Sequence, residues 1–183
     1  MRINITQKEL KQLAACCANK HRPTLENIFL DVSGNRARVI ATDGMILAVI
    51  EKELLNGERI EGELKTAIPA KLYKMFNSRA DIIIESTPNE GEYEARDIKT
   101  NEIARYTAPN NGTRPNYDHI LEGIKKAKRA ADYAIFSPDV LKKIVDIIGI
   151  YDYQHTVPLA EYKNMPHFWK VDNITVVAMP YRS

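Results

Sequence analysis

Apolar and polar positions divide the chain into short strands and a few helices. Residues 2–6 alternate with a period of two, which predicts a strand. Thr6 and Glu9 follow as a capping box, in which each side chain satisfies a backbone N–H of the other residue where a helix begins. Apolar residues then recur at helical spacing and define the buried side of this helix: Leu10, Leu13, Ala14 and Cys17.

The next segment predicts strands and a second helix. Two β-rich runs, 28–32 and 37–50, are separated by the turn sequence Ser33-Gly34-Asn35. Proline suits the first position of a helix, so Pro69 predicts a helix over residues 69–77. We expect its buried side to consist of Leu72, Met75 and Phe76.

Three more strands are predicted at residues 81–86, 93–98 and 103–107, each followed by a cluster of turn-forming residues. Residues 1–122 therefore have the order strand, helix, two or three strands, helix, three strands. This order predicts one complete α+β domain with helices on one face of antiparallel sheets.

Residues 123–183 repeat the second half of that order. A helix or linker is predicted at 123–131 and a strand at 133–136, and Ser137-Pro138-Asp139 signals the start of a helix that ends at Ile148. One or two strands follow, ending at residues 173–179. The pattern indicates a weak internal repeat, so we predict a truncated second domain over 123–183.

Composition limits the class of protein. The chain has 183 residues, 44% of them hydrophobic, which suffices for a core. No run of 18 apolar residues and no signal-peptide pattern occurs, so we expect a cytoplasmic protein with no membrane partner. Cys16 and Cys17 are adjacent, which would strain a disulfide between them, and we expect both to be reduced, with one of them buried.

The sequence offers no catalytic or metal-binding motif. Glycine-rich phosphate loops and nucleophile elbows are missing, and the four histidines have no metal-ligand spacing. Asp43 precedes a glycine, and we favour a turn-forming role over a catalytic or ligating one. We therefore expect a protein that is not an enzyme and that has no cofactor and no metal.

The net charge of +2 does not by itself indicate nucleic acid. The basic run 125–129 is read either as a solvated segment or as a nucleic-acid contact. Lysines also lie away from the apolar side of each predicted helix, and side-by-side helices would join them into one surface for non-specific phosphate contact. Solvated helix faces carry lysines as well, so both readings stay open. These lysines are Lys8, Lys11, Lys71, Lys74, Lys142 and Lys143.

The last third of the chain is rich in aromatic residues interleaved with Lys163 and Lys170. Such residues can stack on unpaired bases or fill a small core, and we favour the core. They are Tyr151, Tyr153, Tyr162, Phe168 and Trp169.

Three segments carry a resemblance to a known family. They are 41–49 (ATDGMILAV), 113–121 (TRPNYDHIL) and 176–183 (VVAMPYRS). In their order and amino-acid sequence they resemble segments of the bacterial DNA sliding clamp family, the DNA polymerase III β subunit. Residues 1–122 resemble its complete middle domain, and residues 132–183 resemble the latter half of its last domain. The resemblance implies the clamp fold, in which helices line the hole of a ring.

The resemblance also implies two kinds of site. The family's DNA-facing loop matches Lys20, His21 and Arg22. Its pocket for an extended peptide matches mostly apolar positions, as such a pocket requires; for Leu47 and Ile120, plain core is the alternative. The matching positions are Leu25, Thr42, Gly44, Met45, Ile46, Leu47, Pro115, His119, Ile120, Val177, Met179, Pro180, Tyr181 and Arg182.

The chain also departs from the family pattern. Judged by this resemblance, we expect a chain without the family's first domain and with half of its last domain missing, and Ser183 stands in place of a final leucine. The more polar pair that follows the family's glycine is here Met45-Ile46. These departures bear on ring closure and on partner preference.

Two functions are therefore expected. The first is a clamp-like processivity factor that binds duplex DNA and tethers a DNA polymerase, clamp loader or other clamp-binding-motif protein, with three or four copies forming a ring. The alternative is a non-encircling module that keeps only the peptide pocket and competes for or recruits clamp-binding proteins.

Overall fold

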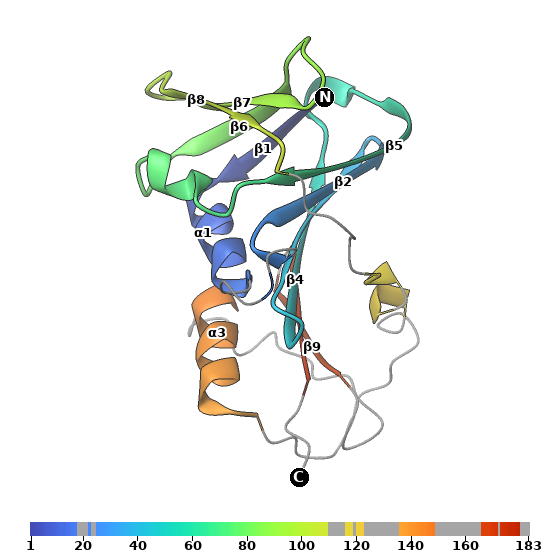
Figure 1. Ribbon diagram of the computed structural model, residues 1–183, viewed down its shortest axis with the longest axis vertical. Helices are drawn as coiled ribbons and strands as arrows, with labels where there is room; N and C mark the ends of the chain where they lie inside the picture. Colours follow the sequence, from blue (N-terminus) through green and yellow to red (C-terminus); the bar gives the residue numbers. More distant parts are fainter. Residues whose placement is uncertain are drawn as a thin grey trace.

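The computed structural model describes residues 1–17, 22, 25–109, 116–118, 120–122, 136–148, 166–171 and 173–179 (Figure 1). Some of the predictions concern residues outside this part. They are the helix or linker at 123–131, nearly all of the strand 133–136, and the aromatic residues Tyr151, Tyr153 and Tyr162. In the described part, no helix is long and apolar enough to cross a membrane.

The described elements form two antiparallel sheets with helices packed against them, as the α+β prediction required. One sheet has the order β1-β6-β7-β8, and the other has the order β5-β2-β3-β4-β10-β9. In chain order the elements are β1 Arg2–Thr6, α1 Gln7–Cys16, β2 Ile28–Gly34, β3 Arg36–Thr42, β4 Ile46–Glu53, η2 Leu55–Gly57, β5 Ile60–Ile68, η3 Leu72–Met75, β6 Asp81–Ser86, β7 Glu92–Asp97, β8 Ile103–Thr107, α3 Pro138–Ile148, β9 His167–Val171 and β10 Ile174–Ala178.

Helix α1 begins as the sequence predicts. Thr6 is its N-cap, and both halves of the capping box with Glu9 are formed. The buried side chains include Leu10 and Leu13, as expected. The two cysteines differ, because Cys16 is fully buried whereas Cys17, at the C-cap, is only partly covered. Both cysteines are free thiols.

The pairing of β10 with β4 joins the two parts of the chain. β10 lies antiparallel to β4 with Ile174 opposite Ile50 and Ala178 opposite Ile46. Helix α3 packs against β10 and against α1, so both helices cover one face of the six-stranded sheet. A single core cluster between sheet and helices includes Leu10 of α1 and Ile144 of α3. The described elements of the last part of the chain are therefore built onto the sheet formed by β2, β3, β4 and β5.

The predicted helix over residues 69–77 is wrong, since only the 3-10 helix η3 forms there. The helix ends after Met75, and the backbone of Phe76 is extended (φ −127°, ψ 154°). Leu72 and Phe76 are buried as expected, but Met75 is 61% exposed. A helix this short cannot keep all three apolar side chains on one side.

The β-rich run 37–50 is divided into β3 and β4 by a hairpin turn at residues 43–45. Strand β5 follows η2, and no strand was predicted over its residues. Seven of its nine residues are exposed or only partly covered, and Ala67 and Ile68 alone are buried in it. That explains why no clear apolar alternation marks this strand.

Glu9 is a polar connection between three elements. Besides the capping box, its carboxylate forms an ion pair with Lys52 of β4 (Nζ–Oε1 2.7 Å) and accepts a hydrogen bond from Asn173 Nδ2 (3.2 Å) beside β10. Burial raises the pKa of Glu9, but the bonds from Lys52, Thr6 and Asn173 together outweigh it and hold the pKa below its ordinary value. Glu9 therefore links α1, β4 and the β9–β10 turn as a carboxylate.

We predict that Glu9→Gln lowers the free energy of unfolding at pH 7 by about 2 kcal/mol, because hydrogen bonds to a charged group are removed. A lowered folded-state pKa means that the stabilisation is complete above the ordinary value of 4.5 and disappears as the pH falls through the folded-state pKa. The difference in free energy of unfolding between the wild type and the variant should therefore become smaller at acidic pH. Urea unfolding at several pH values measures it, with Glu61→Gln on the exposed side of β5 as the control. Equal stability of the two variants at pH 7 would contradict this role of Glu9.

Candidate functional site

A second apolar cluster lies on the face of the six-stranded sheet opposite the helices. It forms because β2, β3, β4 and β10 are apolar on both faces, so alternate side chains point away from the main core. Residues from both parts of the chain contribute to this outer cluster. Its buried members are Leu25, Phe29, Ile40, Leu47, Val49, Tyr117, Phe168 and Val177, with Ile120 and Leu121 packed against them.

The outer cluster brings together predicted site residues that are far apart in sequence. Leu25, Leu47 and Val177 are buried in it, and Ile120 lies against it. Leu47 and Val177 are directly opposite each other in the β4–β10 pairing. Because these side chains are nearly covered, they fit a structural core and the base of a binding surface equally well.

The sequence interpretation missed other members of the outer cluster. They are Phe29, Ile40, Val49, Tyr117, Phe168 and Leu121. The near-continuous apolar runs 37–42 and 46–50 were the available signal, since strands buried on both faces lose their alternation. Phe168 is buried, and Trp169 packs against the main core, as favoured from the sequence.

The hairpin turn at residues 43–45 lies at one end of the outer cluster. Asp43 Oδ1 accepts hydrogen bonds from the backbone N–H of Met45 (2.8 Å) and Ile46 (2.9 Å). Thr42 Oγ1 donates to the carbonyl of Ile46 (2.7 Å) and accepts from the N–H of Gly44 (3.0 Å). Asp43 is thus the turn-forming residue that the sequence favoured.

Two neighbouring positions of the predicted site differ sharply in exposure. Met45 is 54% exposed at the turn, and its carbonyl accepts a hydrogen bond from Met179 N–H (3.0 Å) at the end of β10. Ile46 is buried in the main core on the helix side. The placement of Ile46 in a peptide site is therefore corrected, because the alternation along β4 turns its side chain to the opposite face.

Several predicted residues lie outside the described part of the chain. In the peptide site they are Pro115, His119, Pro180, Tyr181 and Arg182, and in the DNA-facing loop they are Lys20 and His21. Arg22 is described and exposed, and its Nη1 donates to the carbonyl of Asp43 (3.1 Å). The structure thus places Arg22 against the hairpin turn.

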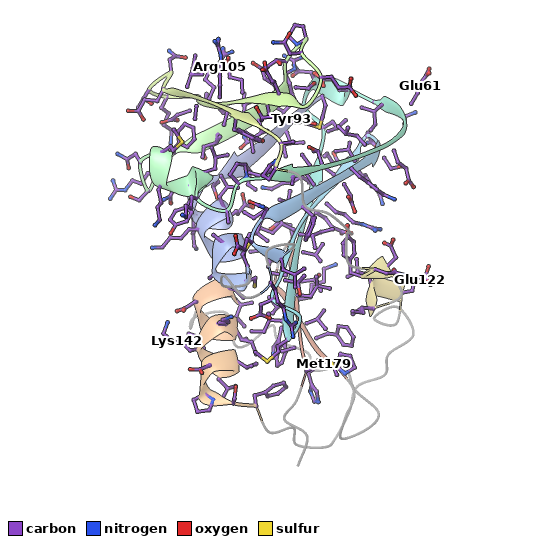
Figure 2. All side chains as sticks on the ribbon, viewed as in Figure 1. Glu61, Tyr93, Arg105, Glu122, Lys142 and Met179 are labelled. Carbon is purple, nitrogen blue, oxygen red and sulfur yellow. The ribbon has the colours of Figure 1, made fainter. Side chains whose placement is uncertain are left out.

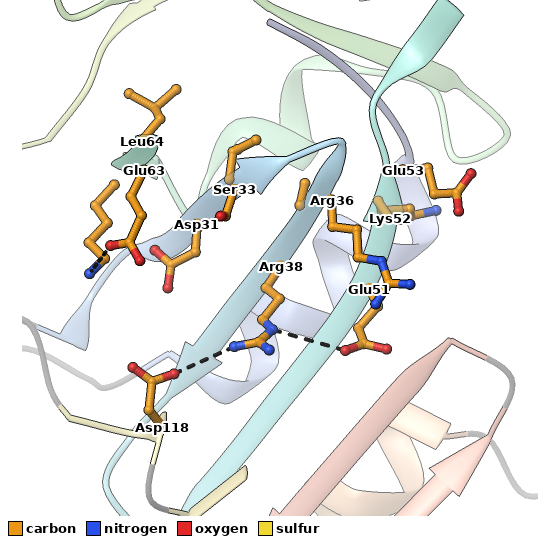
Figure 3. Close-up of a pocket in the computed structure, with 13 residues that line it drawn as sticks. Asp31, Ser33, Arg36, Arg38, Glu51, Lys52, Glu53, Glu63, Leu64 and Asp118 are labelled. Carbon is orange, nitrogen blue, oxygen red and sulfur yellow. Dashed lines mark hydrogen bonds and ion pairs between the residues drawn. The ribbon is translucent and has the colours of Figure 1, made fainter. Parts of the chain in front are cut away.

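Beyond the outer cluster, the same face of the sheet becomes charged and forms a shallow hollow of about 640 Å³ (Figure 3). Tyr117 marks the transition, since its hydroxyl donates to Asp31 Oδ2. Arg38 lies between Asp118 (3.5 Å) and Glu51 (4.0 Å). The face therefore offers an apolar area continuous with a polar area of mixed charge.

The lysines predicted on the helices fall into two groups. Helix α1 packs against both η3 and α3. The lysines of α1 and η3 are exposed: Lys8, Lys11, Lys71 and Lys74.

The lysines of α3 carry compensated charge. Lys142 projects from α3 (Figure 2) and pairs with Asp146 at 2.6 Å. Lys143 forms an ion pair with Asp43. Lys143 is therefore removed from the exposed phosphate-contact group, because its ammonium group is directed to the hairpin turn. The other predicted helix lysines are on α1 and at η3, where Lys71 is the N-cap.

The thiols near the turn are not activated. Burial raises the pKa of Cys17 to about 12 and raises that of Cys16 as well, and the charge of Asp43 contributes to both shifts. Among the described residues, no group of three His, Cys, Asp or Glu side chains could hold a metal ion.

The fold is that of the sliding clamps. The β clamp of Helicobacter pylori, solved with a DNA ligase peptide, matches with a TM-score of 0.71 at 12% identity, over 100% of this chain and 66% of that one. The DNA polymerase sliding clamp of Pseudomonas aeruginosa matches with a TM-score of 0.68 at 15% identity, over 100% and 67%. The DNA polymerase III β subunit of Thermotoga maritima gives 0.68 at 13%, over 100% and 66%.

The chain thus spans about two thirds of the length of these clamps. No protein-family model matches it, and no curated protein matches it by sequence. At this level of identity, the comparison establishes the clamp fold.

We predict that Gly44→Ala destabilises the protein by about 1 to 3 kcal/mol, because Gly44 has φ +89° and side chains are strained there. The new Cβ would also lie 2.2 Å from Arg22 Nη1, which would displace the Arg22 side chain from the turn. Gly34→Ala is the control, since Gly34 has φ +59° with no atom within 4 Å of the added Cβ. Chemical denaturation compares the two, and an equal or smaller destabilisation in Gly44→Ala would count against the proposed turn geometry.

Proposed function

We propose that this chain is a non-enzymatic, clamp-like processivity factor of the cytoplasm. It binds duplex DNA without sequence preference through its helix side and tethers polymerase, clamp-loader or repair partners through the outer face of the sheet. Residues 1–122 act as a complete clamp-like unit and residues 123–183 as a truncated one. The outer cluster, shared between β4 and β10 beneath an exposed Met45, is the observation that carries this proposal.

The outer face suits an extended hydrophobic peptide. Its apolar base is already packed, so a peptide would not have to order it, and Met45 with Met179 provides adaptable apolar contact at the rim. The charged hollow beside Arg38 could hold the polar flanks of such a peptide. The Helicobacter pylori clamp with a DNA ligase peptide supports this class of ligand.

The helix side suits phosphate contact. Lys8 and Lys11 on α1 are exposed, and so are Lys74 of the adjoining η3 and its N-cap residue Lys71. Lysines without bidentate base contacts give affinity that depends on salt rather than on sequence. The peptide surface and this basic surface are on opposite sides of one sheet, so both can be occupied together.

The second candidate is a non-encircling peptide-binding module. Its support is the charge compensation on α3, where Asp146 and Asp43 pair with the two lysines that would extend the basic surface. A ring of three or four copies should give the matching mass in light scattering and be retained on circular DNA. A monomer that binds peptide but is not retained would favour the module.

We predict that Met45→Gln weakens binding of a fluorescein-labelled DNA ligase peptide about tenfold, equal to about 1.4 kcal/mol, because apolar contact is replaced by a polar amide. Met75→Gln is the matched control, since Met75 is similarly exposed but lies on η3. Fluorescence anisotropy measures both affinities. If both variants bind as well as the wild type, the hairpin is not part of the peptide site.

We predict that the double change Lys8→Gln and Lys11→Gln weakens duplex DNA binding. The slope of log K against log salt should become shallower by about 0.9 for each phosphate that the variant no longer neutralises. The control changes Lys65 of β5 and Lys99 of the β7–β8 turn to Gln, which removes the same charge elsewhere. Salt titrations by anisotropy give the slopes. Identical slopes in the two double variants would show that net charge, rather than α1, determines the binding.

A further inference from the structure

Two adjacent lysines of α3 have different partners. Lys142 has a side chain that is 74% exposed and pairs with Asp146 one turn along the same helix. The Lys143 side chain is 31% exposed and reaches Asp43, whose side chain is only 8% exposed, in the β3–β4 turn. Lys143 therefore connects a helix of the second part of the chain to a turn of the first.

The Asp43 carboxylate is held at both oxygens. Oδ1 accepts from the backbone N–H groups of Met45 and Ile46, and Oδ2 accepts from Lys143 Nζ. Fixing both oxygens fixes the plane of the carboxylate, and with it the orientation of the N–H groups that it binds. The carbonyl of Asp43 is held in addition by Arg22.

This turn sets the position of the exposed rim of the outer face. Met45 follows Asp43 by two residues, and its carbonyl is bonded to Met179 N–H. Leu47, two residues further, is in the outer cluster opposite Val177. A turn that is free to change shape would move Met45 relative to β10.

We propose that Lys143 is a positioning residue of the peptide site: acting through Asp43, it fixes the β3–β4 turn that presents Met45. This inference rests on the proposed peptide-binding function. Its physical basis is that the nearly covered carboxylate needs a compensating charge, and Lys143 provides it. Removing that charge leaves the carboxylate with the backbone N–H groups of Met45 and Ile46, whereas Arg22 contacts only the backbone carbonyl of Asp43.

The electrostatics around Asp43 agree with this role. Burial raises the pKa of Asp43, but the bonds from Lys143, Ile46 and Met45 outweigh it, so the pKa lies below its ordinary value. Among the described residues, the other ionisable groups near Asp43 are Arg22, which contacts its backbone carbonyl, and the thiols of Cys16 and Cys17. Both thiols have raised pKa values and are neutral near pH 7, so Lys143 is the ion-pair partner of the carboxylate.

The test compares Lys143→Gln with Lys142→Gln, which removes the same charge from the neighbouring position. The labelled DNA ligase peptide is titrated at pH 7, and thermal melting confirms that each variant is folded. Lys143→Gln should weaken binding about tenfold, whereas Lys142→Gln should stay within about twofold of the wild type. Lys143→Arg should recover most of the affinity, because it keeps the charge and can reach a carboxylate.

The pH profile separates positioning from a general decrease in stability. Without Lys143 the pKa of Asp43 rises, so the affinity of Lys143→Gln should begin to fall at a higher pH than that of the wild type. In an Asp43→Asn background, Lys143→Gln should have no further effect on affinity. Equal affinities of Lys143→Gln and Lys142→Gln, or an unchanged pH profile, would overturn the proposal.

The outcomes for the wild type keep the two claims apart. Failure of the wild-type protein to bind the peptide would refute the proposed function, and the positioning role with it. Binding by the wild type with no specific effect at Lys143 would refute the positioning role alone.

Discussion

The antiparallel pairing of β10 with β4 is the interaction on which the rest of the structure depends. It covers the edge that β4 would otherwise expose, and it places Val177 opposite Leu47 and Met179 beside Met45. It also brings α3 against α1 on one face of the sheet. The shared core and the outer cluster both follow from this one ladder, since each contains side chains from β4 and from β10.

Polar contacts reinforce the same junction from two sides. At one end of β4, the carboxylate of Glu9 binds Lys52 and Asn173. At the other end, Asp43 binds Lys143 of α3. The cost of removing either charge from water is offset because each carboxylate has several donors. The two parts of the chain are thus connected at both ends of β4, and on the proposed function this rigidity holds the peptide surface in shape while DNA occupies the helix side.

Local signals in the sequence predicted much of the fold. These signals depend only on residues that are neighbours in the sequence. The structure confirms the capping box at Thr6, the helix start at Ser137 and the strands 81–86 and 103–107. The prediction of a helix at residues 69–77 failed because Pro69 and three apolar residues produced a helical signal, whereas the buried Phe76 has an extended backbone. Propensity is a weak guide where packing decides.

The candidate site was less predictable, for a related reason. The sequence motif at residues 41–49 indicated that this segment belongs to the site. The strand register, however, decides which of its side chains face the helices. That register puts Ile46 in the main core and leaves Met45 at the rim. The partner of Lys143 could not be inferred from helical spacing, because Asp43 is 100 residues away in sequence.

Hydrogen exchange within strand β4 tests the central claim most directly. By antiparallel alternation, the amides of Leu47 and Val49 face β10, and those of Ala48 and Ile50 face β3. If β10 is a permanent part of the sheet, all four amides should exchange slowly and at comparable rates. Fast exchange at Leu47 and Val49 with continued protection at Ala48 and Ile50 would show that β10 is detached in solution, and would contradict the shared sheet on which the site is built.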